Sequence, residues 1–584
     1  MNIFENIKNF FNGRFDKKVM ESLERQRNKL HFNPLLIMGQ KSLETPEYFS
    51  KRIMEYKVWS MGNARMLRYL YREHAFDADD SVKLNYFWHR APLSRRLVHT
   101  GIPGLISTRM ADILFGSGYD IKAVVYKDGQ GLKEDKNAEK TLNEFVDNLM
   151  SIMDVQSNLQ KGATNESWGG HCFYKLSHDV TVSQYPVLET FDITKCEVVK
   201  VRGITKAVVF KRWYDYKQSN YRLDEIYSTN RDGDATIQYK LFCLDKKGEE
   251  KEVDLLSIPQ TYTRFKVGEN GSQDGMALDE NGVFTYVGLK GMLAFEKPNK
   301  TPSLEFPNSN YGASDYEGAI DSFDALDEIY SQNIREVRTN ETKRYVPEDL
   351  LPMHEVKRHD GSVGMEPDNI DEYADCYVKV KGDPDQDADN KIDYQEVPDK
   401  TTSYMEKWKA VLSTICNKAK ISPFALGITW LEAVNPSADS QRERNKVTLD
   451  MRKGKLALWK PFLEEMILRA LQLNSWMIKN AGVKQEAFEH VDVSWENTCI
   501  QVSFGEYIED STQTRITMWG GAKSQRVAST EACVREIHPD WTEKQIADEV
   551  NLIRFEDGMS TDTPEGLPNL TGTSEVDING EGTE

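Results

Sequence analysis

The chain has 584 residues, of which 39% are hydrophobic, with 11 Trp, 25 Tyr and 24 Phe. This is too long for one core, so we expect three or four structural units, and the composition excludes a disordered protein. The formal net charge of −19 is spread along the chain and argues against a general nucleic-acid binder, although an acidic wall that DNA passes without sticking stays possible.

The seven cysteines are scattered and never form a C-x-x-C pair, which argues against a disulfide framework or a structural zinc site and fits a reducing cytoplasm. No apolar run approaches the ~20 residues of a membrane span. Residues 1–18 place Ile3, Phe4, Ile7 and Phe10 at helical spacing without a signal-peptide core. A membrane-surface helix and a helix docked on its own protein both remain open there.

The first 168 residues read mostly as helix, clearest over Glu47–His74, Leu105–Phe115 and Lys140–Lys161. From Gly169 to about Glu296 the apolar residues recur with period two, which indicates strands. The strands that we expect are Val180–Val187, Cys196–Val201, Ala207–Trp213, Thr236–Leu244 and Val283–Val287.

Two long helices with an insert between them follow. Apolar residues at helical spacing run along the first, at Ile320, Phe323, Leu326, Tyr330, Ile334 and Val337, and along the second, at Met405, Trp408, Leu412, Ile415 and Ala419. Ser403 and Glu406 form a capping box for the second helix. The insert, 341–400, reads as short strands and an acidic loop. We expect the two stripes to pack together, within one chain or between copies.

Ser422-Pro423 ends the second helix, and a loop leads to Asn435-Pro436, a good start for a long helix that reaches Asn480. Pro461 inside this helix predicts a kink. The remaining expected elements are a strand at Val491–Phe504 and three short helices at Ser511–Trp519, Thr530–Ile537 and Thr542–Phe555. The acidic end from Asp557 is expected to be disordered.

Motifs for nucleotide or catalytic chemistry are absent from the sequence: there is no P-loop, no G-x-S-x-G and no H-E-x-x-H. One acidic stretch matches an EF-hand calcium loop at positions 1, 3, 5, 9 and 12, through Asp385, Asp387, Asp389, Asp393 and Glu396. Its flanks look like strand and turn rather than two helices, so an acidic hairpin tip is the competing interpretation. We predict no metal and no cofactor.

A basic cluster stands out in this acidic chain: Arg442, Arg444, Lys446, Arg452, Lys453 and Lys455. Basic residues spaced along one helix can contact phosphate without reading sequence. They can equally form a solvated helix face that pairs with Glu443 and Asp450. Both interpretations stay open at this stage.

The order of these elements resembles the portal proteins of tailed bacteriophages. The residues that carry the resemblance are Ser314-Asp315-Tyr316-Glu317 leading into Asp321-Ser322-Phe323-Asp324-Ala325-Leu326-Asp327, Ile421-Ser422-Pro423-Phe424, Asn435-Pro436-Ser437-Ala438-Asp439-Ser440, and Gly521-Ala522-Lys523-Ser524 with Thr530-Glu531, Asp540 and Glu543. The resemblance covers roughly residues 100 to 556.

That resemblance implies an α+β portal fold assembled as a closed ring. The implied parts are an N-terminal helical region and α/β wing (1–316), a stem helix (317–340), a clip (341–400), a second stem helix (401–421), a tunnel loop (422–441), a long wing helix and strand (442–504), a helical crown (505–556) and a disordered acidic tail (557–584). The chain is then no enzyme.

The implied function is a DNA channel at one capsid vertex, through which a separate terminase motor packages the viral double-stranded DNA. Other implied partners are further copies of the chain (twelve in most family members), the major capsid or scaffold protein, and head-completion adaptor and tail proteins; the location is the virion, with no membrane.

Three sets of site residues follow. The stem would pack through Phe323, Leu326, Tyr330, Trp408, Leu412 and Ile415; Trp430, Glu432, Asn435, Gln441, Arg442 and Arg444 would line the channel; and Asp385, Asp387 and Asp389 would dock partners at the clip. Two hypotheses of other classes compete: a metal-dependent carboxylate hydrolase using the same three aspartates, and a virion scaffold or adaptor that forms no ring.

Overall fold

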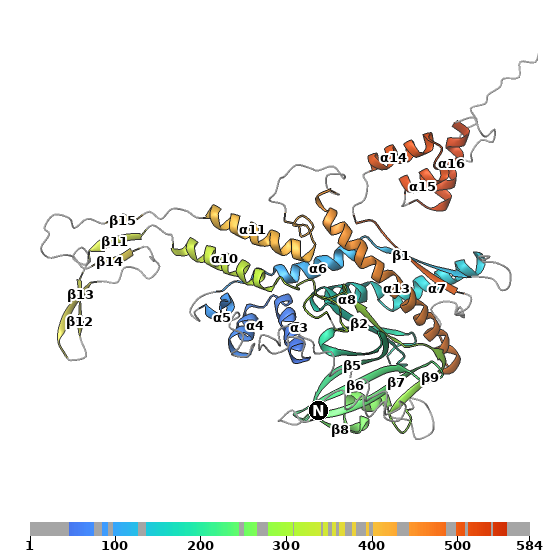
Figure 1. Cartoon of the computed structure of the whole chain (residues 1–584), viewed down its shortest axis with the longest axis horizontal. Helices are drawn as coiled ribbons and strands as arrows, with labels where there is room; N and C mark the ends of the chain where they lie inside the picture. Colours follow the sequence, from blue (N-terminus) through green and yellow to red (C-terminus); the bar gives the residue numbers. More distant parts are fainter. Residues whose placement is uncertain are drawn as a thin grey trace, which may run out of the picture. The chain divides into compact units, whose positions relative to one another are not determined.

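The structure is a computed structural model of the chain, and it combines helices and sheets (Figure 1). It describes residues 46–74, 85–91, 97–125, 136–180, 182–244, 250–265, 278–307, 309–339, 343–347, 353–357, 361–367, 377–380, 393–395, 401–428, 443–485, 498–507, 512–538 and 541–556. The chain divides into two compact units: the first comprises 1–433 and 444–507, and the second 434–443 and 508–584.

The N-terminal part of the first unit is helical, as expected, but in shorter pieces. Its elements are α3 (Pro46–Ser60), α4 (Ala64–Tyr69), a π-helical turn (Leu70–His74), α5 (Phe87–Arg90), α6 (Ile102–Phe115), α7 (Lys136–Ile152) and α8 (Val155–Gly169). The Asn63 side chain accepts hydrogen bonds from the amides of Arg65 and Met66, so it starts a new helix inside the predicted Glu47–His74 helix. Asp154 separates α7 from α8 by its left-handed backbone, with φ 48°, and its side chain makes no capping hydrogen bond.

A six-stranded antiparallel sheet has the order β4-β5-β6-β7-β8, with β9 also paired to β7. Its strands are β4 (Cys196–Val201), β5 (Ile204–Tyr216), β6 (Ser219–Thr229), β7 (Asp234–Leu244), β8 (Glu250–Val253) and β9 (Val283–Lys290). A second sheet, with the order β10-β2-β3, contains β2 (His171–Ser177), β3 (Val187–Asp192) and β10 (Ala294–Pro298). A short helix, α9 (Pro259–Phe265), lies between β8 and β9 in the sequence.

The predicted strand Val180–Val187 is wrong. The amides of Val182 and Ser183 both donate to the carbonyl of Asp179 and close a turn, and β3 begins only at Val187. Strands β2 and β6 were not predicted, because β2 is buried along its whole length and β6 along most of it. A strand buried on both faces lacks the alternation that marks a half-exposed strand.

A third sheet pairs strands that are far apart in the sequence, β1 (Tyr119–Val125) and β16 (Thr498–Phe504), in antiparallel register. Two backbone amides of this sheet donate hydrogen bonds to side chains outside it. The amide of Ala123 donates to Oδ1 of Asn143 on α7 at 2.6 Å, and the amide of Val502 donates to Oε1 of Glu464 at 3.2 Å. An amide held by a side chain is not available to an additional strand.

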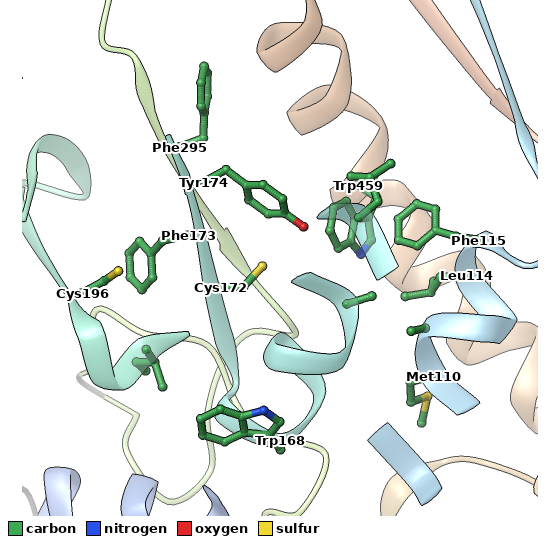
Figure 2. Close-up of a cluster of buried hydrophobic side chains, with 14 of the residues drawn as sticks. Met110, Leu114, Phe115, Trp168, Cys172, Phe173, Tyr174, Cys196, Phe295 and Trp459 are labelled. Atoms are coloured by element: carbon green, nitrogen blue, oxygen red, sulfur yellow. The ribbon is translucent and has the colours of Figure 1, made fainter. Parts of the chain in front are cut away.

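The core of the first unit lies where α6, α8 and β2 meet the long helix α13 (Lys446–Asn480) (Figure 2). The Trp459 ring of α13 lies edge-on to Phe115, with ring centroids 4.9 Å apart. Tyr174 lies against α8 at Gly162, where an added Cβ would come within 1.6 Å of the Tyr174 hydroxyl oxygen. Only glycine fits there.

α10 (Ile320–Thr339) and α11 (Thr401–Ala419) lie side by side (Figure 1). Between them in the sequence, β11 (Lys343–Pro347) pairs with β14 (Tyr377–Val380) and β15 (Asp393–Gln395), and β12 (Met353–Lys357) forms a hairpin with β13 (Val363–Pro367). The expected helix, strand-containing insert and helix are therefore present, with parallel pairing of β11 and β14.

α13 continues as one helix through Pro461. In the second unit, α14 (Thr512–Ser524), α15 (Thr530–Ile537) and α16 (Glu543–Glu556) confirm the three predicted C-terminal helices to within a few residues. Val534, Ile546 and Val550 form its small core. Within the described ranges, no helix is long and apolar enough to cross a membrane.

Candidate functional site

The α10–α11 pair contains all six residues that were predicted to pack the stem, and they fall into two groups. Phe323, Leu326, Leu412 and Ile415 are fully buried. They lie in the half of the pair nearest the sheets, which we call the base half (residues 320–327 and 412–419). The Phe323 ring packs against Trp59 of α3, with ring centroids 5.7 Å apart, so this half belongs to the main core.

The other half of the pair, the outer half (residues 328–339 and 401–411), keeps apolar side chains at its surface. Tyr330 is 39% exposed, Met405 40% and Val337 65%. A hollow of about 270 Å³ opens between the helices, lined by Ile329, Tyr330, Asn333, Tyr404, Met405 and Trp408. The same apolar stripe is thus covered at the base and open farther out.

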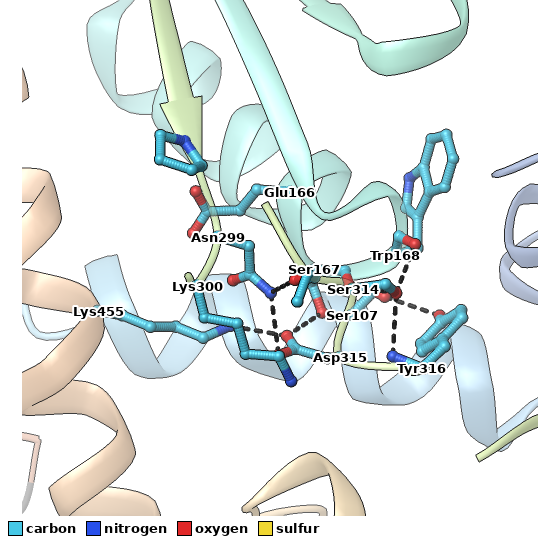
Figure 3. A network of polar contacts seen from close by, with 12 residues as sticks. Ser107, Glu166, Ser167, Trp168, Asn299, Lys300, Ser314, Asp315, Tyr316 and Lys455 are labelled. Atoms are coloured by element: carbon cyan, nitrogen blue, oxygen red, sulfur yellow. Dashed lines mark hydrogen bonds and ion pairs between the residues drawn. The ribbon is translucent and has the colours of Figure 1, made fainter. Parts of the chain in front are cut away.

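A buried polar junction holds the start of α10 (Figure 3). The Asp315 carboxylate accepts from Nζ of Lys455 on α13 at 2.7 Å and from Ser167 Oγ on α8 at 2.8 Å. Nδ2 of Asn299 also donates to it, at 3.0 Å. Although burial alone raises the pKa of the Asp315 carboxyl, Lys455 and Lys300 bring it below its ordinary value. The carboxylate is therefore charged at neutral pH.

A second acid extends this junction toward the core. Glu166 of α8 accepts from Nζ of Lys297 at 3.1 Å and from Nε1 of Trp459 at 2.9 Å. Burial raises the pKa of Glu166, against the opposing effect of Lys297 and Lys455. Helices α8 and α13, strand β10 and the segment that leads into α10 are thereby joined through charged side chains that are buried but paired.

Beside this junction, the backbone at Gly170 lies very close to the backbone at Gly312. Gly170 has φ 76°, and a Cβ there would lie 2.5 Å from the carbonyl oxygen of Gly312. The amide of Asn299 donates to the carbonyl of Gly170, and the amide of Asp315 to that of Ser167. These bonds fix the segment that leads into α10.

Two members of the basic cluster, Arg452 and Lys455, are internal and belong to neither a solvated nor a phosphate-binding face, whereas Arg444, Lys446 and Lys453 are exposed. Lys455 is buried against Asp315, and Arg452 is buried with its guanidinium donating to the carbonyls of Ile113 (2.7 Å) and Gly505 (2.6 Å). Burial lowers the pKa of Arg452. Arg444 is exposed, and its guanidinium lies 5.4 Å from the Phe424 ring centroid.

The other predicted channel residues, Trp430, Glu432, Asn435, Gln441 and Arg442, lie outside the described residues, as do Asp385, Asp387 and Asp389 of the acidic loop. Their roles stay predictions. No group of three or more His, Cys, Asp or Glu residues that could hold a metal ion occurs in the part of the chain that the structure describes.

Sequence reasoning missed a polar flank on α10. Asp321, Asp324, Asp327, Glu328 and Ser331 all bind groups of residues 86–100. Three acids at intervals of three, on a helix that also carries an apolar stripe, are the signal that could have predicted a second packed face.

Comparisons with known proteins give little beyond this geometry. No family model matches the chain, and no curated protein matches it. Among solved structures, it is similar to a chain of the neck of a native GTA particle computed with C12 symmetry, at 9% identity, over 74% of this chain and 89% of that chain, with a TM-score of 0.31. A likeness of this size fixes neither a fold family nor a function.

Proposed function

We propose that this chain is a portal-type subunit, which forms a ring-shaped DNA channel at one capsid vertex and catalyses no reaction. The observation that carries the proposal is the open outer half of the α10–α11 pair. Tyr330 and Met405 line a largely apolar hollow that a single copy leaves unfilled. Apolar surface of this kind is normally covered by association.

The proposed ring, rather than a symmetric dimer, rests on the order of the elements, which resembles that of ring-forming portal subunits. The hollow at Tyr330 and Met405 and the 65% exposed Val337, farther along α10, are apolar surfaces that neighbouring copies would cover. Such contacts close into a ring when they are head-to-tail and the rotation between copies allows it. The resemblance in sequence order supports twelve copies.

In this proposal the strands β11–β15 form the clip, which would dock the terminase motor during packaging and the adaptor and tail proteins afterwards. The major capsid or scaffold protein would surround the ring, and viral double-stranded DNA would pass through it. The location is then the virion. The acidic balance of −19 suits a channel wall that does not hold DNA.

The test is Met405→Asp, which places a charge in the hollow. We expect rings with a central hole for the unchanged chain and single subunits for the variant, seen by negative-stain imaging and by sedimentation velocity. Circular dichroism should stay unchanged, because Met405 is 40% exposed.

The matched control is Asn417→Asp, which adds the same charge at an exposed position of the same helix. It should assemble normally. An unchanged chain that forms no ring at any concentration would reject the proposal in favour of the adaptor hypothesis. If the Met405→Asp variant still formed rings, the outer half would not be the contact between subunits.

A further inference from the structure

Two short stretches of chain, Tyr86–Ala91 and Leu97–Thr100, lie against the polar flank of α10; we call them the clasp. Asp324 accepts from the amides of Phe87 (2.8 Å) and Trp88 (3.3 Å), at the first turn of α5. Asp327, one turn farther along α10, accepts from the amide of Thr100 at 2.9 Å. The clasp therefore depends on carboxylates of the helix that it holds.

The two aspartates differ in how well their charge is stabilised. Asp327 accepts four hydrogen bonds: from the Thr100 amide and hydroxyl, from Trp88 Nε1 and from His99 Nδ1, the last at 2.6 Å. Asp324 accepts only the two amides, and within the described residues no cation lies within ion-pair distance of it. Asp324 is also 94% buried.

The consequence is a carboxyl group that changes charge near neutrality. Burial raises the pKa of Asp324 to about 7; the two amides act in the opposite direction, and the charges of Asp327 and Glu328 raise it further. An ionised Asp324 therefore costs the closed clasp free energy that an open, hydrated clasp would not lose.

Among the described residues, the other charged groups around the clasp are already engaged. Arg90 pairs with Glu328 at 3.0 Å, and Arg72 donates to the carbonyls of His89 and Ala91. The Tyr86 hydroxyl donates to Asp321, and burial together with this bond raises the pKa of Tyr86, so it stays neutral. His99 uses Nδ1 on Asp327, while its buried Nε2 has no partner.

We propose that the clasp is a pH-responsive device, which holds α10 firmly when Asp324 is protonated and loosens as Asp324 ionises. Loosening frees α10 from α5, whereas the hydrogen bonds of the buried junction at Asp315 go to Ser167, Asn299 and Lys455 and involve no clasp residue. The first of the two long helices would thus gain mobility as the pH rises through neutrality. This inference does not depend on ring formation.

The difference in proton binding between the closed and the open clasp determines how clasp stability changes with pH. Since Asp324 binds its proton more tightly in the closed clasp than in the open one, the clasp is most stable below the ordinary Asp pKa and loses stability as pH rises toward about 7. Above that value, closed and open states are both ionised and the dependence ends. Between pH 5 and pH 8 the opening equilibrium should rise by at most about 100-fold.

The experiment is hydrogen exchange of the full chain, followed by mass spectrometry at pH 5, 6, 7 and 8 and corrected for intrinsic exchange rates. In the unchanged chain, protection of residues 86–91 and 97–100 should fall up to 100-fold over this range. Asp324→Asn resembles the protonated acid and should remove the pH dependence while keeping the protection.

The matched control is Glu328→Gln, an acid on the same helix whose partner Arg90 is exposed; it should keep most of the slope. Uniform protection of residues 86–91 and 97–100 across pH in the unchanged chain would overturn the proposal, and this measurement needs no variant to fold. A slope that persists in a folded Asp324→Asn variant would overturn it equally.

Discussion

The base half and the outer half of the α10–α11 pair carry the same kind of apolar stripe but lie in different surroundings. At the base, Phe323 and Leu412 are buried in the main core, and the Phe323 ring packs against Trp59 of α3. In the outer half, Tyr330 and Met405 line a hollow that the single chain does not fill. One repeating pattern thus serves two purposes: stability of the subunit at one end and, we propose, contact between subunits at the other.

The largest expected effect is at the base. Phe323→Ala should lower the free energy of unfolding by about 3–5 kcal/mol, because it empties a fully buried aromatic site. Urea denaturation followed by circular dichroism measures it. A cost below that of the half-buried Ile334→Ala would break the distinction between the two halves.

The junction at the root of α10 should give the next largest effect. Lys455→Met removes one ammonium from the buried Asp315 carboxylate and should cost about 3 kcal/mol, since a buried charge is left with fewer partners. Lys453→Met on the exposed side of the same helix is the matched control and should cost little. Equal costs for the two lysines would contradict the role of the junction.

The smallest expected effect on the single subunit is in the outer half. Trp408→Ala should cost about 1–2 kcal/mol in unfolding, because the ring is only half-buried beside the hollow. Assembly should suffer more than folding does. A loss as large as that of Phe323→Ala would mean that the outer half is part of the core after all.

The spacing of apolar residues predicted the elements whose structure is determined by their own local sequence. The α10–α11 pair, several strands of the large sheet and the three C-terminal helices follow from apolar spacing and capping residues within each segment. Strand β2 and the pairing of β1 with β16 could not be predicted in this way. Their position depends on burial on both faces and on partners hundreds of residues away.

Distant partners also explain why the burial of Arg452 and Lys455 in the basic cluster could not be predicted. Arg452 and Lys455 look like members of a solvated helix face when only their spacing is considered. Their partners are the carbonyls of Ile113 and Gly505 and the carboxylate of Asp315, all distant in sequence. Charge patterns within one helix therefore could not distinguish an internal cation from a surface one. The clasp on α10 likewise binds partners distant in sequence, although the three acids at intervals of three on α10 were a signal for a packed face.

The side chains of Asn143 and Glu464 have a consequence for how this chain meets others in a crowded solution. Each occupies an amide of the β1–β16 ladder that a foreign strand would need. Fusion of sheets between molecules, the route by which unprotected strands form fibres, must first displace one of these side chains. At this sheet, contacts with other copies are therefore restricted to side-chain surfaces, unless Asn143 or Glu464 gives up its amide.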